Sequence, residues 1–301
     1  MGFKEIRKKM QWLDPFTYVD RLVIARTDNL GKEKKHAIFL FCLLFLAAAF
    51  LGLVPMAANA LPLLVVLIAI LGIFYYSNRK EGLDWAIYIS FAFAFAWILF
   101  TGIGLLLGTN SPMVIVLSGS MEPLYHRGDV IILQGTDAAG LQGKEVQLNR
   151  ETLAEVPLSS FAELIYSDSQ EPQIEKISFP ATGQTVDITK QGSIVVYWSL
   201  LRKQPIIHRV VAKLHVADGT YVLTKGDSIQ NSTIDQDCGP VDGLGRPSKN
   251  CIQLYPVKVE ELQGKAVLQI PFVGCFKLWL LDDLGSLITK GRLPSDFSGI
   301  C

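Results

Sequence analysis

Hydrophobic residues are concentrated in the first third of the chain, between positions 37 and 108. Stretches without a charged residue lie at 37–54, 61–76 and 85–107. A helix of about 20 apolar residues is needed to cross a bilayer, and the second stretch is short by that measure. Three such stretches so close together favour membrane spans over buried core helices. We therefore predict three transmembrane helices within residues 37–108.

Lysine and arginine are distributed unevenly around these stretches. The link at 55–60 has no basic residue, whereas the link between the second and third stretches has Arg79 and Lys80. The segment 1–36 is rich in basic residues: Lys4, Arg7, Lys8, Lys9, Arg21, Arg26, Lys32, Lys34 and Lys35. Basic segments stay on the cytoplasmic side. We therefore expect a cytoplasmic N-terminus and an extracytoplasmic chain after residue 108, in the cell membrane or, alternatively, in the endoplasmic reticulum membrane.

The pattern changes to that of β-strands from Ser111 onward. Short runs rich in Val, Ile and aromatic residues alternate with turns that contain Gly and Asp. The predicted strands are 113–117, 130–133, 194–198, 206–216 and 221–224. Residues 150–190 are more polar and are interpreted as an insertion. The predicted organisation is a basic segment at 1–36, three membrane helices at 37–108 and a mainly β domain at 109–301.

Composition and charge exclude some classes of function. The chain has 28 basic and 28 acidic residues, so nothing favours nucleic acid as a partner. No cluster of Cys and His has the spacing of a zinc site, and we predict neither a metal nor another cofactor. Cys238 and Cys251 flank a loop rich in Gly, Pro and Asp on the predicted outer side. A disulfide is predicted there, with free thiols as the alternative.

Ser120 is a candidate nucleophile. It follows a predicted strand and Gly119, and Pro123 ends any regular element soon afterwards. A serine after a glycine is by itself more often an ordinary turn residue. A serine hydroxyl also needs a neighbouring base to take its proton. The candidate therefore depends on a suitable histidine.

His208 is the best candidate for that base among the four histidines of the chain. His36 lies on the predicted cytoplasmic side, and His126 is interpreted as a surface residue. His208 and His215 share one predicted strand, in which side chains alternate between faces. His208 lies on the apolar face and His215 on the other. The alternative is a core histidine with a structural hydrogen bond.

An acidic partner for His208 is predicted from the turn that follows. Asp218-Gly219 between two apolar runs is typical of a two-residue hairpin turn. With that turn, Val210 lies opposite Asp227, and cross-strand partners share a face. Asp227 is therefore expected beside His208, where a carboxylate orients the imidazole. Asp235 could also return to the same imidazole, and both acids remain candidates.

Several short motifs together resemble signal peptidase I. The nucleophile motif is 116–123 (VLSGSMEP), followed by 127–131 (RGDVI), 205–210 (PIIHRV), 224–227 (TKGD) and 270–274 (IPFVG). Their order agrees with the family, and the resemblance covers about residues 111–135 and 200–275. Bacterial members use lysine as the base. The histidine here is similar to the archaeal and endoplasmic-reticulum type, which implies a signal-peptidase-like catalytic domain.

This resemblance implies Ser120 as nucleophile, His208 as general base and the second acid of the last motif as the residue that orients it. Asp235 matches that second acid, and Asp227 matches the first. The family usually separates the two acids by six positions, whereas eight separate them here, and Asp237 is a competitor. Asp235 is our preferred candidate, although the hairpin favours Asp227.

The resemblance also implies how the substrate is held. The Ser120 backbone N–H and the Ser118 hydroxyl would stabilise the oxyanion, the alternative for Ser118 being an ordinary turn hydroxyl. The segment 113–117 would pair with an extended peptide whose residues before the cut are small. The expected substrate-binding residues are Met113, Ile115, Leu117, Met121 and Pro123.

The implied function is a membrane-bound serine endopeptidase that removes signal peptides from exported preproteins. The expected partners are those preproteins and the lipid bilayer, and the sequence leaves open a complex with the secretion machinery. The alternatives are a non-catalytic homologue that binds secretory chains and a protease with a different substrate. The presence of Ser120, His208 and an acid favours the enzyme.

Overall fold

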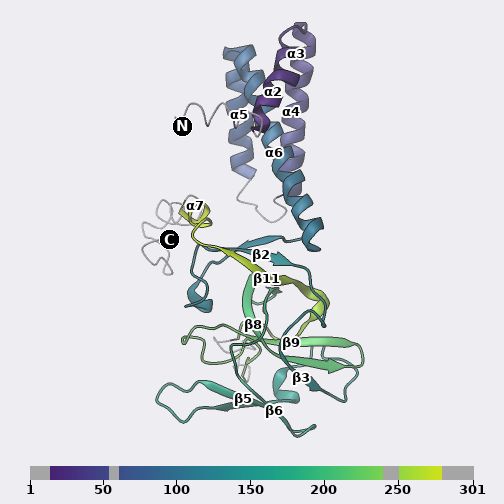
Figure 1. The fold of residues 1–301 in the computed structure, drawn as a ribbon. Helices are drawn as coiled ribbons and strands as arrows, with labels where there is room; N and C mark the ends of the chain where they lie inside the picture. Colours follow the sequence, from purple (N-terminus) through teal and green to yellow (C-terminus); the bar gives the residue numbers. More distant parts are fainter. Residues whose placement is uncertain (1–13, 54–60, 240–250, 280–301) are drawn as a thin grey trace, which may run out of the picture. The chain divides into compact units, whose positions relative to one another are not determined.

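The computed structural model describes residues 14–53, 61–239 and 251–279. Part of the predicted basic segment, residues 1–13, lies outside the described residues. The chain divides after Gly102 into a helical unit and a β-rich unit, which Figure 1 draws as ribbons.

The helical unit packs its helices through aliphatic and aromatic side chains. Phe39, Leu46, Leu71, Tyr75 and Leu83 are buried in its core, and the ring of Phe39 stacks on that of Tyr75 at 4.0 Å between centroids. The elements are α2 (Pro15–Val19), the π-helical turn η2 (Asp20–Ile24), α3 (Ala25–Thr27), α4 (Lys32–Leu53), α5 (Leu61–Ser77) and α6 (Arg79–Leu107). Among the described residues, only α6 is long and apolar enough to cross a membrane.

The β-rich unit confirms the predicted strands. Within the described residues, eight strands form one sheet, in the order β1-β2-β11-β7-β8-β9-β10, with β3 parallel to β8. These strands are β1 (Met113–Ile115), β2 (Val130–Gln134), β3 (Lys144–Gln147), β7 (Ile194–Ser199), β8 (Gln204–Val216), β9 (Gly219–Lys225), β10 (Val257–Lys258) and β11 (Leu262–Ile270). The short helix α7 (Cys275–Lys277) follows. The long strand β8 lies between β7 and β9.

A smaller antiparallel sheet occupies part of residues 150–190. It consists of β4 (Glu163–Tyr166), β5 (Ile174–Phe179) and β6 (Gln184–Asp187). The buried side chains of Ile177 and Phe179 share a core with Leu214 of β8 and Leu223 of β9. This apolar contact fastens the small sheet to the main sheet.

The predicted register of the β8–β9 hairpin is wrong. Val216 pairs with Gly219, so Ala217 and Asp218 form the turn instead of Asp218 and Gly219. A bulge between Val210 and Ala212 then shifts the register again, and Val210 pairs with Thr224. A bulge inserts one extra residue on one strand. The residue that the hairpin brings next to the His208 face is therefore Thr224 rather than Asp227.

Candidate active site

Ser120 lies in a short 3-10 turn, η3 (Gly119–Met121), that follows β1. The edge pairing continues past β1, because Val116 exchanges backbone hydrogen bonds with Asp129 and Gly128. Met121 is fully buried against Ile131 and Leu133. Burial of Met121 fixes the turn to the sheet and leaves Ser120 partly exposed.

The backbone of the turn is held by a second loop. The Ser120 carbonyl accepts the Ser228 N–H at 3.0 Å and the Asn231 Nδ2–H at 3.0 Å. Gly226 allows this approach, since a Cβ atom there would overlap Asn231 Nδ2 and lie 2.6 Å from the Ser120 carbonyl oxygen. The glycine in the 224–227 motif therefore has a steric reason.

His208 reaches Ser120 from strand β8. Its Nε2 lies 3.0 Å from the Ser120 Oγ, and its side chain is 2% exposed. The predicted apolar face is confirmed, because the opposite residue on β7 is the fully buried Val195. This geometry suits proton transfer from the hydroxyl to the imidazole.

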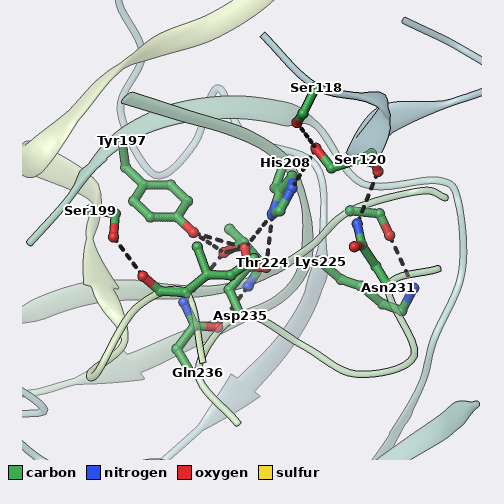
Figure 2. Close-up of polar contacts among 12 residues, drawn as sticks. Ser118, Ser120, Tyr197, Ser199, His208, Thr224, Lys225, Asn231, Asp235 and Gln236 are labelled. Carbon is green, nitrogen blue, oxygen red and sulfur yellow. Dashed lines mark hydrogen bonds and ion pairs between the residues drawn. The ribbon is translucent and has the colours of Figure 1, made fainter. Parts of the chain in front are cut away.

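Asp235 lies on the other side of the imidazole (Figure 2). Its Oδ1 and Oδ2 lie 2.8 and 2.7 Å from His208 Nδ1. The carboxylate is buried and also accepts hydrogen bonds from the Tyr197 hydroxyl at 2.8 Å and the Thr224 hydroxyl at 2.6 Å, both on Oδ2. With Nδ1 donating to Asp235, Nε2 is free to accept the Ser120 proton.

The backbone around Asp235 is fixed on both sides. Its N–H donates to the Thr224 carbonyl at 2.8 Å, and its carbonyl accepts the N–H groups of Ile252 and Gln253, each at 3.0 Å. The predicted disulfide between Cys238 and Cys251 is present and joins the two segments that meet here. Asp235 therefore lies in a loop that is held in place by these hydrogen bonds and by the disulfide, and not in a strand.

Asp227 does not contact His208. Its carboxylate forms a bidentate ion pair with Arg209, with Nε–Oδ1 at 2.8 Å and Nη2–Oδ2 at 2.6 Å. Both side chains are almost buried, at 11% and 6% exposure for Arg209 and Asp227. Arg209 also donates to the Gly192 carbonyl at 2.7 Å. The structure thus places Asp235 at the imidazole and Asp227 beside the neighbouring arginine.

The other predicted site residues lie at different depths. The Ser118 hydroxyl lies 3.5 Å from the Ser120 Oγ and is exposed. Met113 and Pro123 are exposed, whereas Ile115 and Leu117 are partly buried against Cys275 and Leu278. Met121 is fully buried and its side chain offers no surface to a substrate, so we do not carry it forward as a substrate-binding residue.

An open groove of about 540 Å³ lies next to the turn. Its walls are formed by residues that follow the nucleophile, by the chain from the end of β9 onward and by two residues from the region of the small sheet: Glu122, Pro123, Lys225, Asp227, Ser228, Ile229, Gln230, Gln173 and Lys190. The Lys225 Nζ donates to the Gly226 carbonyl at 3.0 Å, and burial lowers the pKa of this amine. The groove offers room for a peptide beside Ser120.

Sequence patterns did not identify several polar residues of the site. Tyr197 has the alternating position of an ordinary strand residue, and Gln236 and Asn231 lie in irregular chain. Thr224 belongs to the 224–227 motif and could have been found there. No group of three His, Cys, Asp or Glu side chains that could hold a metal occurs in the described part of the chain.

Comparison with known proteins finds relatives that match about two thirds of the chain. No family model matches the chain. The signal peptidase complex catalytic subunit SEC11 of Scheffersomyces stipitis is 25% identical over 207 residues, covering 69% of this chain and 88% of that protein. SEC11 of Colletotrichum graminicola is 28% identical, covering 66% and 80%. SEC11 of Schizosaccharomyces pombe is 26% identical, covering 67% and 85%.

These similarities run through most of both chains, at about the same level in different fungi. They confirm the predicted resemblance to signal peptidase I of the endoplasmic-reticulum type. The chain is therefore a homologue of the catalytic subunits of the signal peptidase complex.

Proposed function

We propose that this protein is a membrane-bound signal peptidase I, a serine endopeptidase that removes N-terminal signal peptides from exported preproteins. The observation that carries the proposal is the hydrogen-bonded series from Ser120 Oγ through His208 to Asp235. It occurs in a homologue of signal peptidase catalytic subunits. A non-catalytic homologue would not need a buried imidazole aligned between a serine and a carboxylate.

In the first half of the reaction, His208 Nε2 takes the proton from Ser120 Oγ as the oxygen attacks the scissile carbonyl carbon. The charge that develops on the carbonyl oxygen is stabilised by the Ser120 backbone N–H and the Ser118 hydroxyl. The imidazolium then gives its proton to the leaving amine of the mature protein. The signal peptide remains attached to Ser120 as an ester.

Water completes the reaction. His208 removes a proton from the water, the hydroxide attacks the ester carbon, and the proton returns to Ser120 Oγ as the signal peptide leaves as a carboxylate. Asp235 stays ionised throughout and holds the imidazole with Nδ1–H towards itself. Its buried position next to His208 supports this role.

The edge of the sheet is the proposed place for the signal peptide. Strand β1 is the terminal strand of the main sheet within the described residues and leads directly to the Ser120 turn. An extended peptide added to such an edge gains backbone hydrogen bonds, and side-chain pockets give specificity. Met113, Ile115, Leu117 and Pro123 are the substrate-binding residues that we retain.

The helical segments are proposed to anchor the enzyme beside its membrane-inserted substrates. Helix α6 supplies the candidate span. We propose two further spans at 37–54 and 61–76, a cytoplasmic segment at 1–36 and an extracytoplasmic β domain from residue 109, in the cell membrane or the endoplasmic reticulum membrane. Digestion of the β domain by a protease added to sealed vesicles whose cytoplasmic face is outward would contradict this topology.

The proposed function is tested with the purified full chain in detergent. The substrate is a model preprotein with alanine immediately before the junction between signal peptide and mature protein. It is compared with a preprotein that has tryptophan at that position. A preprotein with a conservative change far from the junction is the control. We expect a mature fragment of the correct intact mass from the alanine substrate and the control only. Failure to cut the alanine substrate, or equal cutting of the tryptophan substrate, would contradict the proposal.

A further inference from the structure

Three neighbouring strands direct one side chain each towards Asp235. Tyr197 comes from β7, His208 from β8 and Thr224 from β9, and these strands are adjacent in the sheet. The pleat explains the arrangement. Val195 of β7 pairs with His208, and Tyr197, two positions further along β7, lies on the same face of the sheet. Thr224 of β9 pairs with Val210, which lies on the same face as His208. The carboxylate thus lies against one face of the sheet, beside these three side chains (Figure 2).

The direction of each hydrogen bond is determined by the surroundings. The Thr224 hydroxyl receives the Gln236 Nε2–H at 3.3 Å, so its own proton is directed to Asp235. Gln236 is in turn fixed by the Thr224 N–H, which donates to Gln236 Oε1 at 3.1 Å. Burial, and then the charge of Asp235, raise the pKa of Tyr197 well above its ordinary value, so the phenol keeps its proton and donates.

The Tyr197 and Thr224 hydroxyls supply the hydrogen bonds that a buried carboxylate requires. Asp235 is 2% exposed, and a buried carboxylate without hydrogen bonds is expensive. Both hydroxyls meet Oδ2, so they also fix the rotation of the carboxylate plane relative to His208 Nδ1. A side chain that merely packed here would need no hydroxyl group.

We propose that Tyr197, together with Thr224, is a positioning residue of the peptidase: its hydroxyl holds Asp235 in the orientation that aligns His208 with Ser120. This inference rests on the proposed function. Tyr197 touches no reacting atom and acts only through Asp235. Its contribution should therefore disappear when Asp235 can no longer act.

The first test is Tyr197→Phe in the full chain. Because the lost hydrogen bond is to a charged group, we expect kcat to fall by about tenfold or more while KM stays within about twofold. The acid limb of the pH profile should also move to higher pH. With one donor fewer, the carboxylate attracts the imidazolium proton more strongly, and more of His208 stays protonated at a given pH.

Other charges near the carboxylate must stay constant for this comparison. Lys225 also interacts with the charge of Asp235, and it is unchanged in the variant. Thr224→Ser keeps the hydroxyl and should retain activity, whereas Thr224→Val should lower kcat in the same direction as Tyr197→Phe.

Tyr166→Phe is the matched control. The Tyr166 hydroxyl donates to Asp237 Oδ2 at 2.6 Å, two residues beyond Asp235, without any contact with His208. We expect it to leave kcat and the pH profile unchanged. A fall in kcat equal to that of Tyr197→Phe would indicate a general effect of lost phenols and would overturn the proposal.

The decisive experiment is the double variant that carries both Tyr197→Phe and Asp235→Asn. The two effects on kcat should be non-additive, so that Tyr197→Phe costs little in the Asp235→Asn background. Wild-type kcat and pH profile in Tyr197→Phe, or full additivity, would overturn the inference and leave the proposed function intact. Failure of the wild type to cleave the preprotein would overturn the proposed function, and the positioning role with it.

Discussion

Replacement of Asp235 by asparagine is expected to lower kcat by about 10⁴-fold while the protein stays folded. Tyr197 and Thr224 both donate to the carboxylate. An amide would therefore turn its oxygen towards these hydroxyls and its NH₂ group towards His208 Nδ1. The imidazole would then carry its proton on Nε2, where it cannot accept the proton of Ser120. Steady-state cleavage of the model preprotein measures the loss.

Asp237→Asn is the control for that substitution. Asp237 accepts from Tyr166 and Thr233, and its chemistry is the same, but it does not contact the imidazole. It should retain wild-type kcat. The account would be contradicted if Asp235→Asn kept full activity while a folded Asp227→Asn variant was inactive, since that result would return the orienting role to Asp227.

The largest loss of stability is expected from Asp227→Ala. The ion pair with Arg209 is almost fully buried, and removal of one partner leaves a buried charge unpaired. Such a change costs about 3–5 kcal/mol, or a fall in Tm on the order of 10 °C for a domain of this size. Thermal unfolding of the full chain in detergent measures it.

Asp187→Ala provides the comparison for the buried pair. Asp187 pairs with Lys176 at 3.3 Å, but both side chains are about half exposed or more. Exposed pairs contribute about 0–1 kcal/mol, so Tm should hardly change. Similar small shifts for the two variants would show that the Arg209–Asp227 pair does not stabilise the domain.

Much of the fold could be predicted because it follows from local patterns. Runs of Val and Ile predicted the first and last residues of β2, β7 and β8 to within one or two positions. His208 was placed correctly because alternation of side chains determines its face within a single strand. The register between β8 and β9 depends instead on a bulge at Val211 and on which residues form the turn.

The turn itself shows why register is harder. Asp218-Gly219 has the composition of a two-residue turn, yet Gly219 opens β9 with φ at 142°. The turn lies one residue earlier than predicted, and the bulge shifts the register by one further residue. Together they place Thr224 instead of Asp227 opposite Val210, on the face of His208. Asp235 lies in irregular chain, so the strand pattern left it as one of two candidates, and only the resemblance to signal peptidase I favoured it over Asp227. No pattern indicated Tyr197.

For the membrane segments, the helices themselves could be predicted, but their environment could not. Length and apolarity define α6 as a candidate span without any packing information. The stretches 37–54 and 61–76 correspond to α4 and α5, whose role in the membrane depends on the Lys and Arg distribution and remains a proposal. Local composition thus predicts a helix more readily than its environment.

Cleavage of a model preprotein by wild type and Ser120→Ala tests the central claim most directly. Ser167→Ala, in the region of the small sheet, is the matched serine control. The account predicts that the wild type and Ser167→Ala release the mature fragment at the same rate, whereas Ser120→Ala releases none above the uncatalysed background. Equal cleavage by Ser120→Ala and wild type would contradict it.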